Sequence, residues 1–517
     1  MTSTDQSKAA RGHEAYRRAV EFLNGLQVFG ARFGLETARQ LAASVGNPQE
    51  KLRFIHVAGT NGKGSTCAML ESIYRAAGLR VGLFTSPHLV SFRERIQINR
   101  HLISEADVVR LVDELRAATE RRSPNRLGFD QQRADSEIGV PPGVQASPTL
   151  FEFTTVMALR YFAEQKCELV IWETGLGGRL DATNIVTPLA SVITNIGLDH
   201  QQWLGDTLEK IAAEKTGIIK SGVPVVTTAN QPEVLPVIER IAREQNAPLT
   251  KVWREQPGVF SLSSPEGGEG RGEEAQLCSV QIPSPQPSPR SGGEREPESL
   301  SPLPLPGEHQ RLNAALALAT VEVLQSKIPV TEKAIHAGLT KVNWPGRMQL
   351  VTLPSGQRIL LDGAHNPDGA ETLRAALRTG APVSAPARPV GLLKHAGSET
   401  GAPLALILGI LGDKNCRAMC DILAPLAARV LVVPVKSERT AAPDELAEFC
   451  RTANPAASVA SCASLSEALE RVADEAFVVI AGSLYLIGEA MELLHLSAAP
   501  EQDEKSLNEW TQKRQGS

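Results

Sequence analysis

Short runs of apolar, largely β-branched residues alternate along this chain with segments of helical periodicity. A run that is apolar at nearly every position is typical of a parallel strand buried on both faces, and the helical segments between runs are the crossovers that such strands need. The runs lie at residues 54–58, 81–85, 169–173, 190–194, 224–228, 358–361, 405–408, 430–433 and 477–481. The sequence therefore predicts an α/β protein with mainly parallel sheets.

The length and the grouping of these runs predict two domains. The chain has 517 residues, more than a single hydrophobic core usually holds. A helical pattern at 309–325 closes the first group of runs, and the turn-forming segment NWPGRMQ precedes the second group. We therefore expect a larger domain over residues 1–342, a smaller α/β domain over 343–497 and a polar tail over 498–517.

Polar, turn-rich segments interrupt this pattern at three places. They lie at residues 121–148, 263–306 and 381–401, and the second contains the string SPEGGEGRGEEAQ. Segments of this composition cannot bury enough apolar surface to offset the entropy lost on ordering. We interpret all three as flexible insertions in surface loops.

Charge and hydropathy limit the classes of partner. The chain carries 58 acidic and 53 basic residues, a net charge of −5, which argues against nucleic acid or an anionic membrane as the main partner. No apolar run reaches the ~18 residues of a membrane span, and the N-terminal segment lacks the apolar core of a signal peptide. We expect a cytoplasmic protein. Its seven cysteines form no CxxC motif, which favours small buried thiols over a metal site.

The stretch HVAGTNGKGST, from His56 to Thr66, joins the first apolar run to a helical pattern. Its spacing, GxxGKG[ST], is a variant of the common phosphate-binding loop. The physical features are the same: glycines let backbone N–H groups surround a phosphate, the helix N-terminus adds partial positive charge and Lys63 adds a full one. This stretch predicts a nucleotide phosphate site.

Polar residues follow several of the other apolar runs. Ser86 and Glu173 stand at the ends of two runs, and Asp199 and His200 follow a third. In open α/β sheets, ligands bind beyond the carboxyl ends of the strands. Residues that are far apart in the sequence are therefore expected to meet the phosphate loop at one sheet edge.

The motifs AGTNGKGST, TSPHLVSFRERI, ETGLGGRLDATN, ITNIGLDHQQWLGDTLEKIAAEKTGIIK, HQRLNAALA, WPGRMQ and LDGAHNPDG occur in this order. In combination they resemble the folylpolyglutamate synthase/dihydrofolate synthase family of ATP-dependent Mur-type amide ligases, over residues 15–495 apart from the three insertions. The resemblance implies a P-loop-type Mur-ligase central domain that binds ATP, Mg²⁺ and folate, followed by a Rossmann-like ligase domain. It also implies that a substrate carboxylate takes the γ-phosphoryl group of ATP and that the amine of L-glutamate then displaces phosphate.

The resemblance also implies a role for each matching position. The positions that would bind ATP are Gly59, Thr60, Asn61, Gly62, Lys63, Gly64, Ser65, Thr66, Asn313, Arg347 and Asp362. Those that would hold a pair of Mg²⁺ ions are Ser86, Glu173, His200 and Lys215, the lysine as a carbamate (N6-carboxylysine). Folate would contact Phe92, Arg95, Phe151 and Glu152, and L-glutamate would contact His365 and Ser483. The residues implied in catalysis are Lys63, Asp181, Lys215 and His365.

Several of these residues also have an ordinary structural explanation. Mg²⁺ normally prefers oxygen ligands, so His200 also fits a hydrogen-bonded interior histidine. Lys215 fits a solvated helix lysine, Asp181 an Asx-turn, Ser86 a helix N-cap and Phe92 core packing. Because the implied site residues are divided between the two expected domains, we expect domain closure to assemble the site and exclude water from the acyl phosphate.

Other functions remain open from the residues alone. One is a cell-wall Mur ligase that extends a UDP-sugar peptide, although only the residues before the phosphate loop are available for an extra N-terminal domain. Another is a P-loop switch protein that hydrolyses ATP without joining substrates, and a third is an interaction scaffold based on the Pro/Ser-rich insertion. The folate hypothesis leaves dihydropteroate and reduced folates as alternative substrates, and we expect a monomer that acts on small molecules.

Overall fold

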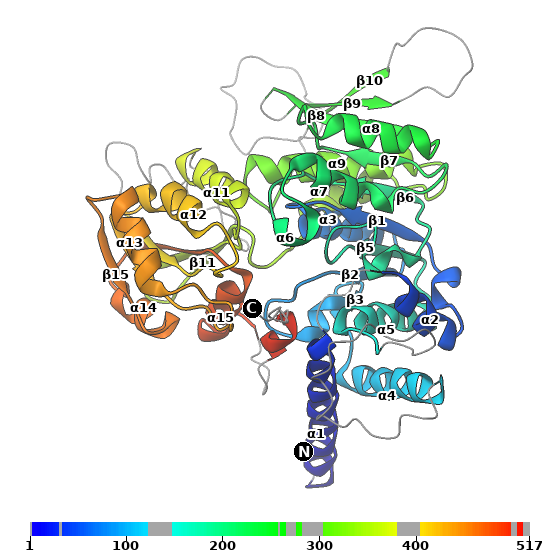
Figure 1. Cartoon of the computed structure of the whole chain (residues 1–517), viewed down its shortest axis with the longest axis horizontal. Coiled ribbons are helices and arrows are strands. Elements are labelled where there is room, and N and C mark those ends of the chain that lie inside the picture. Colours follow the sequence, from blue (N-terminus) through cyan, green and yellow to red (C-terminus); the bar gives the residue numbers. More distant parts are fainter. Residues whose placement is uncertain are drawn as a thin grey trace, which may run out of the picture.

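The computed structural model describes residues 3–29, 34–122, 147–256, 259–264, 276–281, 303–379, 404–497 and 504–509. Its strands form two sheets that lie side by side, the first built from the blue-to-green part of the chain and the second from the yellow-to-red part (Figure 1). This arrangement, with mainly parallel strands in both sheets, confirms the predicted fold class.

The first sheet has the strand order β10-β9-β8-β7-β6-β1-β5-β2-β3-β4. Neighbouring strands are parallel from β2 to β8 across the centre, and the pairs at both ends are antiparallel. The strands are β1 (Phe54–Ala58), β2 (Val81–Phe84), β3 (Ile96–Ile98), β4 (His101–Leu102), β5 (Leu169–Glu173), β6 (Ala190–Ile193), β7 (Val225–Thr227), β8 (Leu249–Gln256), β9 (Val259–Ser264) and β10 (Gln276–Gln281).

Helices cover both faces of this sheet because its central strands are apolar on both faces. One buried cluster joins the central strands to α3, α9 and α10, and a second joins them to α1, α2, α4 and α5. The α-helices are α1 (Ser3–Gly25), α2 (Glu36–Ser44), α3 (Lys63–Ala76), α4 (Glu105–Arg122), α5 (Leu150–Glu164), α6 (Gln201–Leu204), α7 (Leu208–Lys215), α8 (Leu235–Glu244), α9 (Glu308–Val323) and α10 (Glu332–Thr340). Short 3₁₀ helices are η1 (Leu26–Phe29), η2 (Pro48–Lys51), η3 (Phe92–Arg95), η4 (Ala182–Ile185) and η5 (Thr216–Ile218).

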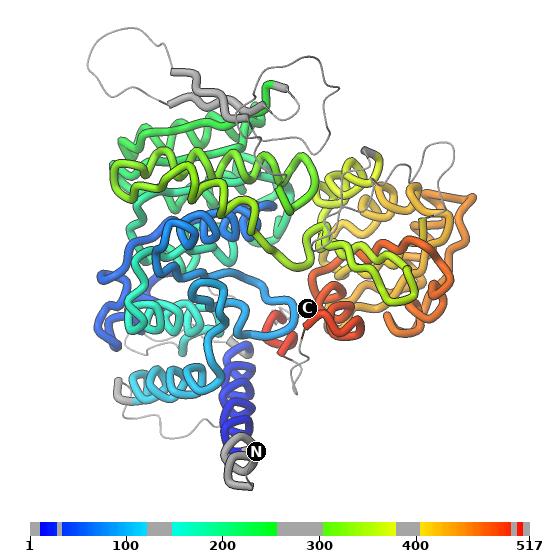
Figure 2. The backbone as a smooth tube through the Cα atoms, turned by 180° about the vertical axis from the view of Figure 1, so that it is seen from behind, coloured from blue at the N-terminus to red at the C-terminus, as the bar shows by residue number. Residues whose placement is uncertain are grey.

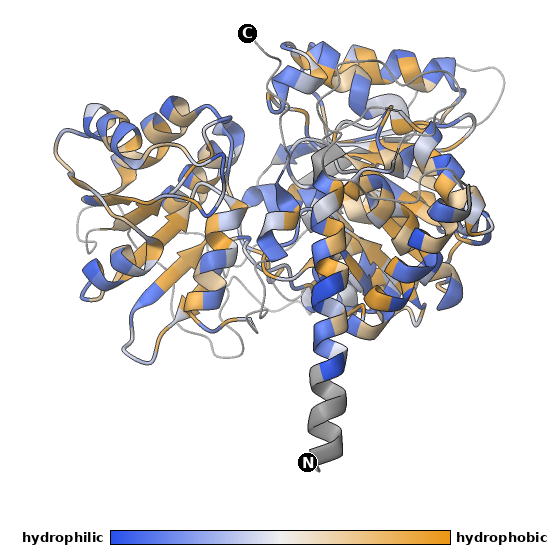
Figure 3. Cartoon of the chain, turned by 60° about the horizontal axis from the view of Figure 1, so that its bottom comes forward, coloured by the Kyte–Doolittle hydropathy of each residue, from blue (hydrophilic) through white to orange (hydrophobic). Residues whose placement is uncertain are grey.

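The second sheet has the order β11-β12-β16-β13-β14-β15, in which only β11 runs antiparallel to its neighbour. Two buried clusters lie on its opposite faces. Its strands are β11 (Gln349–Thr352), β12 (Arg358–Leu361), β13 (Ala405–Leu408), β14 (Arg429–Val432), β15 (Ser458–Ser461) and β16 (Phe477–Ala481). The helices are α11 (Pro367–Thr379), α12 (Cys416–Leu423), η6 (Ala424–Leu426), α13 (Pro443–Ala453), α14 (Leu465–Arg471), α15 (Leu484–Leu493) and η7 (Glu504–Asn508). Figure 3 shows apolar residues concentrated on the strands and polar ones on the outer helix faces.

Each of the apolar runs predicted as a strand is one in the structure. The chain passes from the first sheet to the second between α10 and β11, the interval that contains the predicted boundary at 342. Residues 123–146, 282–302 and 380–403, which make up most of the predicted insertions, lie outside the described residues. Within 263–306, β10 pairs antiparallel with β9, so a strand lies inside the segment predicted to be a flexible loop.

Two further expectations concern the thiols and membrane spans. Five of the cysteines, Cys67, Cys167, Cys420, Cys450 and Cys462, are free and buried, as predicted, and Cys416 is free and partly exposed. In the same part of the chain, no helix combines the length and the apolar character needed to cross a bilayer.

Candidate active site

The carboxyl ends of strands from both sheets border one cavity of about 460 Å³. It is lined from the first sheet by the phosphate loop and by residues that follow β2, β5 and β6, and from the second by residues that follow β12, β13 and β16. The predicted site residues in its wall are Gly59, Thr60, Asn61, Gly62, Lys63, Gly64, Ser65, Ser86, Arg95, Phe151, Glu173, His200, Lys215, Asn313, Arg347, Asp362, His365 and Ser483. The structure therefore brings most of the predicted residues to one place.

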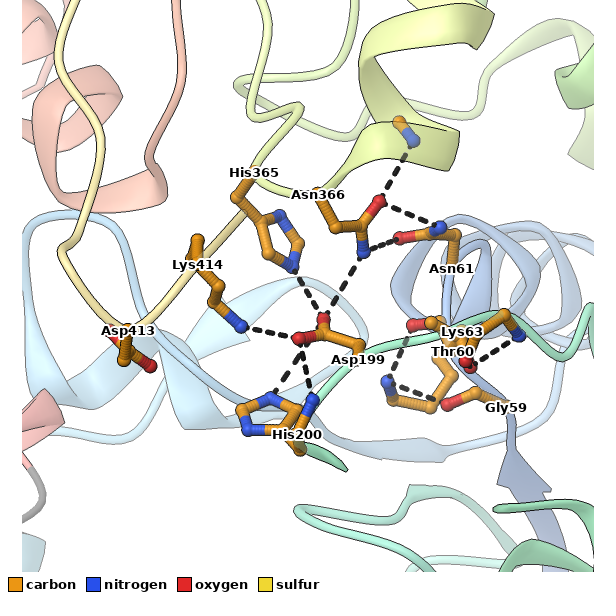
Figure 4. Close-up of polar contacts among 12 residues, drawn as sticks. Gly59, Thr60, Asn61, Lys63, Asp199, His200, His365, Asn366, Asp413 and Lys414 are labelled. Carbon is orange, nitrogen blue, oxygen red and sulfur yellow. Dashed lines mark hydrogen bonds and ion pairs between the residues drawn. The ribbon is translucent and has the colours of Figure 1, made fainter. Parts of the chain in front are cut away.

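The phosphate loop connects β1 to α3 and is held in shape by Asn195. The backbone N–H of Thr60 donates to the Asn195 carbonyl (2.8 Å), and that of Asn61 donates to Asn195 Oδ1 (2.7 Å). Gly62 has φ +86°, and a Cβ there would lie 2.5 Å from Asn313 Oδ1, so this position requires glycine. Lys63 Nζ donates to the carbonyls of the loop itself, at 3.1 Å and 3.2 Å (Figure 4).

Glu173 ends β5 as a nearly buried carboxylate. Its side chain is 3% exposed, and Oε2 accepts a hydrogen bond from the backbone N–H of Ser86 (3.0 Å). Burial raises the pKa of Glu173 to about 7, against the opposing charge of Lys63. A cation bound directly to this carboxylate would stabilise its charged form, which burial otherwise disfavours.

Lys215 lies at the end of α7 and is 4% exposed, so it is not a solvated helix lysine. Its Nζ donates to the Gly59 carbonyl (2.8 Å), and burial together with Lys63 lowers its pKa to about 7. A large fraction of its amine is therefore neutral near pH 7, which is the form that reacts with CO₂ to give a carbamate. Burial also lowers the pKa of His200 to about 3, so its imidazole is neutral and able to act as a ligand.

The donor set can be tested for its fit to Mg²⁺. Among the described residues, no group of three or more His, Cys, Asp and Glu side chains is placed to hold a metal. The predicted ligands include one carboxylate, one imidazole and the Ser86 hydroxyl, all in the wall of one cavity. Mg²⁺ commonly binds through one or two carboxylates and keeps several waters, so this set fits a partly hydrated ion.

Arg347 and Asp362 face the cavity from the second sheet. Asp362 follows β12 and accepts hydrogen bonds from the backbone N–H groups of Met348 (2.8 Å) and Ala364 (3.0 Å). Arg347 packs against Gly363, where a Cβ would lie 2.1 Å from Arg347 Nη1. Burial lowers the pKa of this guanidinium, while the negative charges of Asp362 and Glu173 oppose the shift. A partly buried cation thus lies in the cavity wall.

A polar network centred on Asp199 joins the two sheets (Figure 4). Lys414 Nζ lies 2.6 Å from Asp199 Oδ1, and these side chains are only 7% and 8% exposed. Asn366 Nδ2 donates to Asp199 Oδ2 (3.1 Å) and to Asn61 Oδ1 (3.1 Å), and His365 Nε2 lies 3.7 Å from Asp199 Oδ2. Although burial alone would raise it, the pKa of Asp199 is held well below its usual range by two charges: that of His200, which is protonated only in the acid range where Asp199 titrates, and that of Lys414.

Four predicted residues do not line the cavity. Glu152 forms a capping box with Thr149 at the start of α5, and Phe92 is fully buried in the core, so the structure differs from their predicted folate contacts. Asp181 caps η4 and accepts hydrogen bonds from the backbone N–H groups of Thr183 (3.0 Å) and Leu176 (2.7 Å). These contacts correspond to the Asx-turn, the structural explanation that the sequence allowed for this residue beside a catalytic role. Thr66 is buried, and its hydroxyl has no hydrogen-bond partner within the described residues.

Several cavity residues were absent from the predicted site. They include Asp199, Lys414, Arg439, Tyr485 and Asn508. Asp199 carried a signal, because it stands beside His200 after an apolar run. Lys414 follows β13 by six residues, but neither it nor Asn508 lies in a pattern that distinguishes it from a surface residue.

Comparisons with known proteins agree with this geometry. Residues 346–484 match the family model of the Mur ligase, glutamate ligase domain. A dihydrofolate synthase/folylpolyglutamate synthase of Bacillus subtilis (strain 168) is 34% identical, over 93% of this chain and 99% of its own length. The chain belongs to the folylpolyglutamate synthase/dihydrofolate synthase family.

Solved structures of this synthase family have the same fold. The chain is similar to Escherichia coli FolC in complex with DHPP and ADP, with a TM-score of 0.71 and 28% identity over 93% of this chain and 98% of that one. It is also similar to folylpolyglutamate synthase from Thermotoga maritima, with a TM-score of 0.69 and 32% identity over 95% of this chain and 99% of that one. These matches confirm the family predicted from the motifs.

Proposed function

We propose that this synthase-family chain is an ATP-dependent ligase that joins L-glutamate to a carboxylate of dihydropteroate or of a reduced folate. The carboxylate attacks the γ-phosphorus of ATP to give an acyl phosphate and ADP, and the glutamate amine then attacks the acyl carbon and releases phosphate. The observation that carries the proposal is the shared cavity, which places the phosphate loop opposite Arg347, Asp362 and His365.

The phosphate loop, Asn313, Arg347 and Asp362 would bind ATP. Lys63 bonds only its own loop carbonyls among the described residues, so a triphosphate offers its ammonium stronger, anionic partners. The guanidinium of Arg347 approaches from the second sheet, where it would stabilise charge on the phosphoryl group in flight. We place the division between the two domains at residue 342, so Arg347 would reach the phosphates when the domains close.

Ser86, Glu173 and His200 would hold one Mg²⁺, and Lys215 would help hold a second as a carbamate. Bound Mg²⁺ neutralises the phosphate charge that would otherwise repel the attacking carboxylate. The low pKa of Lys215 and its burial beside the Gly59 carbonyl support the modification. A carbamate would also supply the second carboxylate-type ligand that the side chains alone lack.

The remaining residues would bind the two organic substrates. Phe151 and Arg95 would contact the folate or dihydropteroate, while His365 and Ser483 would contact L-glutamate. Burial and the charge of Lys414 lower the pKa of His365 to about 4, so its imidazole is neutral at pH 7. His365 Nδ1 lies 2.8 Å from the Gly363 carbonyl, to which it would donate, and this leaves Nε2 to accept a hydrogen bond from the glutamate amine. We propose a monomer that acts on these small molecules.

An assay of the purified chain with ATP, radiolabelled L-glutamate and each acceptor in turn tests the proposal. We expect labelled product with dihydropteroate, with a reduced folate or with both, and one ADP per amide formed. Lys63→Ala should remain folded and lose this activity. Phosphate release that needs neither glutamate nor an acceptor would instead support an ATP-hydrolysing switch, and labelling of only a UDP-sugar peptide by its amino acid would support a cell-wall ligase.

A further inference from the structure

The last described segment, residues 504–509, lies in the interior of the protein although it comes after most of the chain. Its 3₁₀ helix η7 lies beside the loop that follows β2 (Figures 1 and 2), in contact with α1 and η3. Glu504 is 2% exposed, Lys505 3%, Leu507 2% and Asn508 4%. Segments near chain ends are usually poorly ordered unless contacts hold them in place. We call residues 504–509 the C-terminal strap.

The strap is bonded to the part of the protein that contains the first sheet. Glu504 Oε2 accepts hydrogen bonds from Ser91 Oγ (2.9 Å) and from the backbone N–H of Phe92 (2.6 Å). His88 Nε2 lies 2.8 Å from the Glu504 carbonyl. Leu507 belongs to the same buried cluster as Phe92. The strap therefore holds the loop between β2 and β3 by both polar and apolar contacts.

The strap is also bonded to the part that contains the second sheet. The hydroxyl of Tyr485, in the first turn of α15, donates to the Asn508 carbonyl (2.5 Å). Lys505 forms an ion pair with Glu492, near the end of the same helix. Because it bonds the β2–β3 loop on one side and α15 on the other, the strap ties together the two parts that share the cavity.

At the cavity wall the strap fixes the guanidinium of Arg95, which is 5% exposed. Arg95 Nη2 donates to Asn508 Oδ1 (2.5 Å) and to the Leu507 carbonyl (3.4 Å), and Nε donates to His88 Nδ1 (2.9 Å). Asn508 Nδ2 donates in turn to the His88 carbonyl (3.0 Å), which fixes the orientation of the amide.

Arg95 has no carboxylate within ion-pair distance in the described part of the chain, and its Nη1 makes no hydrogen bond there. A buried guanidinium without a counter-ion is costly, and a carboxylate is the group that best matches its free N–H edge. The cavity would hold such a group when the acceptor substrate is bound.

We propose that the C-terminal strap closes the acceptor end of the cavity and that Asn508 is a positioning residue, which orients Arg95 toward a carboxylate of the acceptor. The inference rests on the proposed function, because it takes the acceptor to be the carboxylate-bearing substrate. Asn508 acts through Arg95 and takes no part in the bond changes at phosphorus or carbon. Changes in the strap should therefore weaken the binding of the acceptor much more than the binding of ATP.

The variant Asn508→Ala tests the positioning role of this residue. Ser506→Ala is a matched control in the same turn, because Ser506 does not line the cavity and its Oγ donates a hydrogen bond to Asn24 Oδ1 (3.1 Å). Hydrogen bonds to charged groups contribute about 1.5–3 kcal/mol, or roughly 10- to 150-fold. We expect Asn508→Ala to raise the acceptor KM by roughly that factor, with the KM for ATP within about twofold of wild type. Asn508→Asp should also raise it, because its carboxylate would compete with the acceptor for Arg95. Equal changes in both KM values, or an unchanged acceptor KM in a folded Asn508→Ala protein, would overturn the proposal.

A comparison of truncated chains tests the strap independently of the proposed function. Chains ending at residue 503 and at residue 512 would be compared by amide hydrogen exchange in residues 87–95, without substrates. We expect faster exchange only in the shorter chain, whether or not the protein ligates glutamate. Equal protection in the two chains would refute the strap. Failure of the full chain to ligate any acceptor, with faster exchange in the shorter chain, would refute the proposed function and the role of Asn508 toward the acceptor, but not the strap.

Discussion

The ion pair between Lys414 and Asp199 is the contact between the two sheets that is most open to a quantitative test. Truncating one partner of a buried, hydrogen-bonded charge pair costs about 2–5 kcal/mol, largely because the other charge is left uncompensated. In Lys414→Ala, Asp199 would still have Asn366 at 3.1 Å and His365 at 3.7 Å. The free-energy cost of this substitution should therefore lie at the lower end of that range, about 2–3 kcal/mol. At about 1.4 kcal/mol per factor of ten, this is roughly 30- to 140-fold.

We expect this cost to appear in kcat/KM for glutamate ligation, because the pair joins Asp199 after β6 to Lys414 after β13 and so stabilises the assembled cavity. Steady-state kinetics and thermal unfolding of Lys414→Ala would be measured beside Lys210→Ala, which removes an ion pair whose side chains are 62% and 73% exposed. The control should behave as wild type. The double variant Asp199→Asn/Lys414→Met leaves neither charge buried. Its loss of activity, expressed as a free energy, should therefore be smaller than the sum of the losses in the two single variants. A kcat/KM within threefold of wild type for Lys414→Ala would refute the reasoning.

The other predictions concern the remaining charged residues of the cavity. Arg347→Ala should lower kcat by roughly 10- to 150-fold, the equivalent of a charge-assisted hydrogen bond, while the melting temperature changes little; equal losses of activity and stability would contradict the role in closure. The pKa of Glu173 is raised from 4.5 to about 7, so the metal-free folded protein binds the extra proton in this window and its stability should fall as the pH rises from about 4.5 to 7. Glu173→Gln should reduce this slope in thermal unfolding and abolish the stabilisation by Mg²⁺ at pH 8, and a retained Mg²⁺ shift would exclude Glu173 as a ligand. Lys215→Ala should lower turnover by roughly 10- to 100-fold, and added formate or acetate should restore part of the activity. The intact mass of the wild-type protein should show one bound CO₂. A wild-type mass without this adduct, together with no recovery of the variant, would exclude the carbamate.

Much of the fold follows from local sequence patterns. The apolar runs are strands because each is buried on both faces, and a fully buried strand needs apolar residues throughout. The strands that were not predicted are short or lie near sheet edges, where half of the residues face water and the pattern weakens. β15 (Ser458–Ser461) and β4 (His101–Leu102) are examples, since none of their residues is buried.

The part of the site that lies at strand ends was also predictable, because parallel strands bring their carboxyl ends to one edge. Ser86, Glu173, His200 and Asp362 line the cavity for this reason. The placement of Glu152 in the folate site overlooked a local signal, since a threonine followed three residues later by a glutamate is the pattern of a capping box.

Lys414 and Asn508 were missed for a different reason. Their partners are distant in sequence: Asp199 lies 215 residues from Lys414, and His88 lies 420 residues from Asn508. Nothing in the residues around them distinguishes them from solvated surface side chains. Only the folded structure places the tail against the loop after β2 and Lys414 against the first sheet.

Transfer of oxygen from the acceptor to phosphate tests the central claim most directly. An acceptor whose reacting carboxylate is labelled with ¹⁸O would be incubated with ATP, Mg²⁺, L-glutamate and the purified chain, and the released phosphate analysed by mass spectrometry. An acyl phosphate requires that each phosphate formed carries one carboxylate oxygen, so we predict phosphate labelled once per amide formed. Unlabelled phosphate, or label that enters only from water, would contradict the account.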